Sequence, residues 1–292
     1  MLRTDRTVVV VAAVGIAAVA WLGFLGHKSF PVHHTGGILV TGADDSGIGR
    51  DAAISLAKKG YVVYAGVRRP TDATSISDEK IDTLVPVIID VTKSNTILAA
   101  FEFIKIDDAR WNFEVNYFGL IAVTQQAIPL LRAAGGGSRI VQASSIAGIL
   151  AIGGGNPYSA TRFAVESLSQ SLRLELSPWD ISVSIINPGY IATKNLENVV
   201  EQRANADAAQ QKLYPHILGD AVLQNEQRLM KQAPTTEVTT TAIEDAIMSP
   251  TPQIRYVLGA ADGVSFSTVK RIKDLLPERI FDKILSLPPP QQ

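Results

Sequence analysis

One feature constrains the fold more than any other: an apolar stretch that runs into a glycine-rich turn and then into a helix-forming segment. The stretch is GGILVTG, the turn continues as ADDSGIGR, and the next segment, DAAISLAKKG, ends at Gly60. Glycines let the backbone approach a ligand closely, and the N–H groups at the start of a helix point towards an anion. This order predicts a phosphate-binding cradle on the first strand of an α/β domain, with an ordinary strand-to-helix turn as the alternative.

Two further apolar stretches, YVVYAGVRRP and LVPVIIDVT, have the length and composition of buried strands. The first ends in Val67, Arg68 and Arg69, without an acidic residue. In dinucleotide-binding folds an acidic residue at this position binds the ribose hydroxyls of NAD, whereas an arginine accommodates the 2′-phosphate of NADP. We therefore expect Arg68 to bind the 2′-phosphate, with Arg69 as the second candidate, and the chain to favour NADP(H) over NAD(H). The alternative is a pair of solvated surface arginines.

A second group of residues, between Ser144 and Arg162, has a spacing suited to proton transfer. Tyr158 follows Ser145 by thirteen positions, and Arg162 follows Tyr158 by four. Residues four apart lie on one face of a helix, so the cation is expected beside the phenol ring. A permanent positive charge favours the phenolate, and a serine hydroxyl facing it can hold a substrate oxygen. These residues predict a device that moves a proton on or off an alcohol or carbonyl.

In order, these motifs resemble the short-chain dehydrogenase/reductase family over residues 36–260, whose signature is Ser followed by Tyr-x-x-x-Lys. The resemblance implies a doubly wound, Rossmann-like parallel sheet and hydride transfer between a nicotinamide cofactor and an alcohol or carbonyl. It makes Tyr158 the acid/base, Ser145 the hydrogen-bond partner of the substrate, and Asn116 part of the proton relay. The N-terminal segment and the Arg-Arg-Pro ending resemble the hydroxysteroid and retinol dehydrogenase branches, so the expected substrate is a lipophilic alcohol or ketone.

The same resemblance assigns the cofactor contacts. They are Gly42, Ser46, Gly47, Ile48, Gly49, Arg68, Arg69, Asp90, Val91, Tyr158, Arg162, Pro188, Gly189 and Thr193. Thr193 closes a Pro-Gly-x-x-x-Thr motif, in which the family's threonine meets the nicotinamide carboxamide. A threonine after such a turn is equally well explained as a helix N-cap.

Two departures from the family pattern bear on activity. Four residues separate Gly42 from Gly47 where the family has three, which brings an Asp44–Asp45 pair beside a site meant for pyrophosphate. Arg162 stands where the family has lysine. Arginine keeps the charge, but it does not release a proton near neutral pH and its fork is larger than an ammonium. We therefore predict that turnover is weakened or absent and that Arg162→Lys raises it.

A third departure concerns the middle of the expected sheet. The family's fourth strand, with Asn-Asn-Ala-Gly, is missing, and Asn116 follows Asp90 by only 26 positions. Each buried, unpaired backbone group left by a lost central strand costs roughly 1–3 kcal/mol. We expect either that residues 90–105 rearrange to fill the gap or that the first strand pairs directly with SRIVQASS. The remaining alternative is a shortened product of a longer reading frame.

The segment from Thr7 to Gly26 is uncharged and long enough to cross a bilayer. Its twenty residues span about 30 Å as a helix, the thickness of the hydrocarbon core. We predict a single-pass anchor in a membrane, of the endoplasmic reticulum type if the source is eukaryotic. The alternative is a cleaved signal peptide, whose apolar region is usually shorter, about 7–15 residues. Arg3 and Arg6 weakly place the N-terminus in the cytosol, and the side of the membrane is left open.

We expect three parts: residues 1–34 as anchor and linker, residues 35–260 as the Rossmann-like catalytic domain, and residues 261–292 as an amphipathic C-terminal segment and tail. Residues 194–239 fall where the family's variable substrate lid lies. The apolar stripe of the last part predicts packing against a core, and contact with the membrane surface is the alternative.

Composition excludes other classes of function. The chain has no cysteine, which excludes disulfides and thiol nucleophiles, and its formal net charge of −1 argues against a nucleic-acid surface. The four histidines lack metal-ligand spacing, so we predict no metal. Homodimer formation is left open. The main alternative function is a catalytically inert or incomplete isoform that acts, if at all, as a binding protein. A third alternative is an epimerase-type relative, but such proteins usually have a longer C-terminal substrate domain than this chain offers.

Overall fold

The computed structural model describes residues 29–33, 36–44, 46–89, 101–151, 153–194, 197 and 207–285. The predicted anchor, residues 7–26, and the predicted cofactor residues Asp90 and Val91 lie outside these ranges. Inside them, no helix combines the length and the apolar character that crossing a bilayer requires. The anchor therefore stays a prediction.

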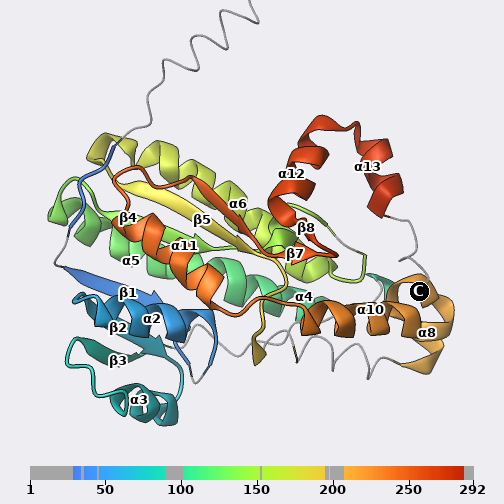
Figure 1. Cartoon of the computed structure of the whole chain (residues 1–292), viewed down its shortest axis with the longest axis horizontal. Helices are drawn as coiled ribbons and strands as arrows, with labels where there is room; N and C mark the ends of the chain where they lie inside the picture. Colours follow the sequence, from blue (N-terminus) through green and yellow to red (C-terminus); the bar gives the residue numbers. More distant parts are fainter. Residues whose placement is uncertain are drawn as a thin grey trace, which may run out of the picture.

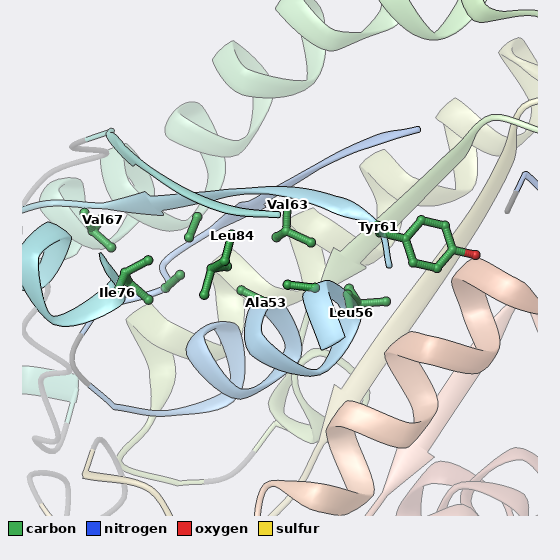
Figure 2. Packing of buried hydrophobic residues seen from close by; sticks show 10 residues of the cluster. Ala53, Leu56, Tyr61, Val63, Val67, Ile76 and Leu84 are labelled. Atoms are coloured by element: carbon green, nitrogen blue, oxygen red, sulfur yellow. The ribbon is translucent and has the colours of Figure 1, made fainter. Parts of the chain in front are cut away.

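The first half of the described chain forms a parallel sheet of three strands (Figure 1). The order is β1-β2-β3, from β1 (Gly37–Thr41), β2 (Val62–Val67) and β3 (Leu84–Ile88), joined by α2 (Ile48–Lys58) and α3 (Pro70–Ser77). One face of α2 is apolar, and it packs against the β-branched residues of β2. Figure 2 shows the resulting core between strands and helices, which includes Ala53, Leu56, Val63, Val67, Ile76 and Leu84.

A second parallel sheet holds the other three long strands. Its order is β4-β5-β6, from β4 (Arg139–Ala143), β5 (Ser182–Pro188) and β6 (Arg255–Leu258). Six of the seven residues of β5 are buried, as expected for a central strand. The helical elements are η1 (Phe101–Phe103), α4 (Ile106–Phe113), η2 (Glu114–Phe118), α5 (Gly119–Ala134), η3 (Ile146–Gly148), α6 (Asn156–Glu175), η4 (Ser177–Trp179), α8 (Ala208–Leu213), α9 (Pro215–Leu218), α10 (Asp220–Lys231) and α11 (Glu237–Met248).

The single doubly wound sheet that we expected is split between β1 and β4. Within the described residues β1 pairs only with β2, and β4 pairs only with β5, so direct pairing of the first strand with residues 139–143 is not observed. All residues of both strands line one cavity of about 1980 Å³. The split lies where the missing fourth strand was noted. The other expected solution involves residues 90–105, most of which lie outside the described ranges.

Two connections hold the half-sheets together across the split. Helix α11 packs on α2 and on β4, β5 and β6 (Figure 1). Between the two helices, the hydroxyl of Ser55 donates a hydrogen bond to Glu244, and the Lys59 ammonium lies 3.4 Å from the same carboxylate. The second connection is the segment 29–33. Its His33 carbonyl accepts a hydrogen bond from the Tyr61 hydroxyl at 3.0 Å, and its Pro31 carbonyl accepts one from the Arg139 guanidinium at 3.0 Å.

The chain continues after β6 with a short antiparallel pair and two helices. They are β7 (Ala260–Ala261), β8 (Val264–Ser265), α12 (Phe266–Leu275) and α13 (Glu278–Leu285). Phe266 and Phe281 are buried in a cluster with Ile146, Ile149 and Leu150, which follow β4. Part of the apolar stripe of this segment, Phe266, Val269 and Leu276, thus packs against the loop that carries Ser145. The rest of the stripe, Ile272, Ile280 and Ile284, is exposed. The boundaries proposed at residues 34 and 260 stay predictions.

Candidate active site

Ser145, Tyr158 and Arg162 line one cavity, and Ser145 stands at the carboxyl end of β4. Ser145 directly follows this strand and caps η3, where its hydroxyl accepts a hydrogen bond from the Ala147 N–H at 3.1 Å. Pro157 lies in the first turn of α6, a position that favours helix initiation. Tyr158 and Arg162 are therefore one turn apart at the start of α6. The central guanidinium carbon of Arg162 lies 4.9 Å from the centroid of the Tyr158 ring.

Arg162 links three elements of the site. Its Nη2 donates to the side-chain oxygen of Asn116 at 3.2 Å, and its Nη1 donates to the Ala143 carbonyl at 3.1 Å. Asn116 lies on η2, a turn of π-helix, and such turns are frequent at functional sites. The Nε atom of Arg162 is buried and has no hydrogen-bond partner among the described residues. Arg162 therefore holds Asn116 and still offers one buried donor.

A buried polar network behind Ser145 was not predicted from the sequence. The Asn187 amide donates to the Ser145 carbonyl at 2.9 Å and to Glu166 at 2.5 Å. Glu166 in turn accepts hydrogen bonds from Arg255 on β6, one of them at 3.2 Å from Nε. The position of Glu166, four residues after Arg162 on the inward side of α6, was the signal that could have revealed this network. It fixes the strand end that carries Ser145.

The glycine loop has the backbone conformation that a phosphate cradle requires. Gly42 and Gly47 adopt φ values of +71° and +113°, which side chains with a Cβ atom rarely adopt. A Cβ atom on Gly49 would lie 2.3 Å from the Gly42 carbonyl oxygen, so only glycine fits there. Helix α2 begins at Ile48, and its first N–H groups lie beside the loop. This geometry suits an anion at the helix N-terminus.

The cavity between β1 and β4 gathers most of the predicted site residues. Its lining includes Gly42, Ser46, Gly47, Ile48, Gly49, Asn116, Ser145, Tyr158, Arg162, Pro188, Gly189 and Thr193. The carbonyl of Thr193 also accepts a hydrogen bond from the Glu197 N–H at 3.2 Å, as at the start of a helix. Among the described residues, the lining does not include Arg68 or Arg69.

Both predicted phosphate-binding arginines are paired with carboxylates. The Arg68 Nε donates to Asp44 at 2.6 Å, and the Arg69 Nε donates to Asp72 at 2.7 Å. The hydrogen bond from Arg69 holds the pKa of Asp72 below its ordinary value, against the opposing effect of its burial. The sequence analysis predicted neither pair. Asp44 is 24 positions away from Arg68, whereas Asp72 is only three positions after Arg69, a spacing that could have revealed that pair.

Comparisons with known proteins identify relatives of this chain. A family model described as short chain dehydrogenase matches residues 96–204. The chain is similar to 17-beta-hydroxysteroid dehydrogenase type 6 of Bos taurus, with 31% identity over 76% of this chain and 80% of that protein. It is also similar to Retinol dehydrogenase 5 of Mus musculus, with 29% identity over 94% of this chain and 95% of that protein.

Solved structures share the fold. A short-chain dehydrogenase from Streptomyces avermitilis matches with a TM-score of 0.64 and 24% identity, covering 86% of this chain and 97% of that one. ElxO with NADP bound matches with a TM-score of 0.59 and 17% identity, covering 75% of this chain and 94% of that one. At such identities the likeness shows only that the chain has a Rossmann-like α/β fold. The division of its sheet into two parts departs from the single sheet of that fold.

Proposed function

The chain belongs to the short-chain dehydrogenase/reductase family, in its hydroxysteroid and retinol dehydrogenase branch, and is an oxidoreductase of alcohol and ketone groups; from this premise we propose that it transfers a hydride between NADP(H) and a lipophilic alcohol or ketone. The observation that carries the proposal is the meeting of Ser145, Tyr158 and Arg162 in the cavity that the glycine loop also lines.

The described residues fit a dinucleotide. The loop at Gly49 leaves no room for a Cβ atom, and the buried Nε of Arg162 offers a donor that a ribose hydroxyl could satisfy. A bound nicotinamide would supply or accept the hydride. Gly189 and Thr193 line the same cavity, at the end of β5, and would contact the nicotinamide end. Asp90 and Val91, the expected adenine contacts, stay predictions.

The side chains would divide the work as follows. The Ser145 hydroxyl holds the substrate oxygen, and Tyr158 gives a proton to that oxygen in reduction and removes it in oxidation. The guanidinium of Arg162, whose central carbon lies 4.9 Å from the centroid of the phenol ring, holds that ring in place in the cavity. Asn116 belongs to the relay that exchanges this proton with water.

A lipophilic substrate is proposed from two observations. The relatives named for retinol and for 17β-hydroxysteroids act, by their names, on large apolar alcohols. The site itself is bordered by apolar side chains, including Ile146, Leu150 and Ile191. We further propose that residues 7–26 anchor the chain in a membrane, from which such a substrate would be drawn.

A specific observation also favours the second candidate, an inert relative that binds a dinucleotide without turning over. Arg162 already engages the side-chain oxygen of Asn116 at 3.2 Å, and the sheet beneath the site is split. In this candidate the cofactor cleft is retained while proton exchange is blocked.

The test uses the full chain in detergent micelles. NADPH is titrated by nicotinamide fluorescence, and turnover is measured as the reduction of NADP+ by retinol and by a 17β-hydroxysteroid. Tyr158→Phe is expected to keep cofactor affinity and to lose at least about a hundredfold in turnover, because it lacks the proton donor. Tyr64→Phe, on the exposed side of β2, serves as the matched control. Failure to bind any dinucleotide would refute both candidates, and binding without measurable turnover would select the inert one.

A further inference from the structure

Asp44 occupies the end of β2, although it belongs to the glycine loop. One carboxylate oxygen accepts a hydrogen bond from the Arg68 backbone N–H at 3.0 Å. The other accepts from Arg68 Nε at 2.6 Å and lies 2.5 Å from its Nη2. The backbone contact positions the carboxylate at the strand end independently of the flexible arginine side chain. The strand end therefore carries a carboxylate after all, supplied by the neighbouring loop.

This position is partly shielded from water. The side chain of Asp44 is 14% exposed and that of Arg68 is 36% exposed. Ion pairs that are partly buried are screened less by salt than fully exposed ones. The pair is therefore a local restraint on where the guanidinium can reach.

We propose that Asp44 weakens the binding of NADP(H) relative to NAD(H) by holding Arg68 away from a 2′-phosphate, so that the NADP(H) preference of this chain is smaller than Arg68 alone would give. The proposal rests on the proposed function, in which a dinucleotide lies over the glycine loop. The 2′-hydroxyl of NAD(H) can donate to the Asp44 carboxylate without disturbing the pair. A 2′-phosphate must take Arg68 from Asp44 and then lie beside a negative charge. Asp44 thus opposes the NADP(H) preference that Arg68 by itself would give.

Arg69 is no substitute for Arg68. Its Nε and Nη2 donate to the two oxygens of Asp72, at 2.7 and 2.6 Å. The Asp72 side chain is only 2% exposed, whereas the Arg69 side chain is 58% exposed. Both cations at the strand end are engaged, and a phosphate must break an existing pair to bind either of them. The second pair also provides a matched control for the first.

The experiment compares dissociation constants of NADPH and NADH for the full chain and three variants. In Asp44→Asn the amide oxygen can still accept from the Arg68 N–H, but the negative charge is gone. The dissociation constant for NADPH is expected to fall about tenfold to a hundredfold, whereas that for NADH stays the same or rises. Asp72→Asn is expected to change the ratio of the two constants by less than about threefold, because Arg69 does not read the 2′ position. In Asp44→Asn/Arg68→Ala the gain should disappear.

The outcomes are distinct. If NADPH and NADH both bind and Asp44→Asn leaves their ratio unchanged, this inference is wrong while the proposed function stands. An equal gain in Asp72→Asn also overturns it, because the effect would then be one of net charge. If no dinucleotide binds to any variant, both proposals fail. Should the asparagine variant not fold, Asp44→Ser repeats the test, since serine also offers an acceptor without a charge.

Discussion

Replacement of Arg162 by lysine is expected to raise turnover about tenfold, because it would free the relay residue that the arginine now holds. Nη2 of Arg162 donates to the Asn116 side-chain oxygen at 3.2 Å, and Nη1 donates to the Ala143 carbonyl at 3.1 Å. A guanidinium does not release protons near neutral pH, so the oxygen of Asn116 stays engaged unless this bond breaks. A lysine is shorter, and its ammonium can rotate among acceptors.

The magnitude follows from the bond that must break. Hydrogen bonds to charged groups contribute roughly 1.5–3 kcal/mol, and a length of 3.2 Å is at the long end of the usual range. The lower figure applies, and about 1.4 kcal/mol corresponds to a factor of ten in rate. The substitution also loses the stacking of the guanidinium over the Tyr158 ring, 4.9 Å away. That loss, about 1 kcal/mol, should lower Tm by about 2–4 °C.

The assay is a single-turnover measurement of nicotinamide absorbance with saturating retinol, on the full chain in micelles. Arg162→Met, which removes the charge, is expected to be slower than the wild type. Arg173→Lys makes the same replacement near the other end of α6 and should change nothing. A lysine variant slower than the wild type would show that the guanidinium is the working cation. The reasoning about Asn116 would then be refuted.

Two further predictions concern the scaffold. Burial, reinforced by a hydrogen bond to Asp245, raises the pKa of Tyr256 above its ordinary value. The neutral phenol therefore stabilises the fold fully below about pH 10, and this stabilisation is lost as the pH rises further. Tyr256→Phe should flatten the alkaline fall in Tm, and a parallel fall in both proteins would contradict this. In each half-sheet β1 and β4 have a paired strand on one side only, whereas β2 and β5 are paired on both sides. Half of the amides of β1 and β4 should therefore exchange their hydrogens at least about tenfold faster than the amides of β2 and β5. Equal protection would mean that another segment fills the split.

Local spacing was enough to predict that Tyr158 and Arg162 lie side by side. The interval between Tyr158 and Arg162 is one helical turn, so their proximity depends only on the helix forming, and Pro157 starts it. The glycine loop was predictable for the same reason, since Gly42, Gly47 and Gly49 act within one short turn. Such contacts follow from backbone geometry alone.

Contacts between distant segments could not be predicted in this way. The pairing of Asp44 with Arg68 depends on the register of β1 against β2, and the extra loop residue was interpreted only as a repulsive neighbour of pyrophosphate. The network of Asn187, Glu166 and Arg255 joins β5, α6 and β6, which meet only in the folded sheet. The absence of the Asn-Asn-Ala-Gly strand was predicted from the sequence, but sequence spacing does not determine how the neighbouring strands respond.

The late position of α11 in the chain has a consequence for biosynthesis. This helix, Glu237–Met248, packs on α2 from one half-sheet and on β4, β5 and β6 from the other. A ribosome that adds about 5–20 residues per second needs roughly ten seconds or more to reach it after α2 has emerged. During that interval the side of α2 that faces α11 in the folded chain lacks this cover. Chaperones that bind nascent chains should therefore engage α2 until α11 has been synthesised.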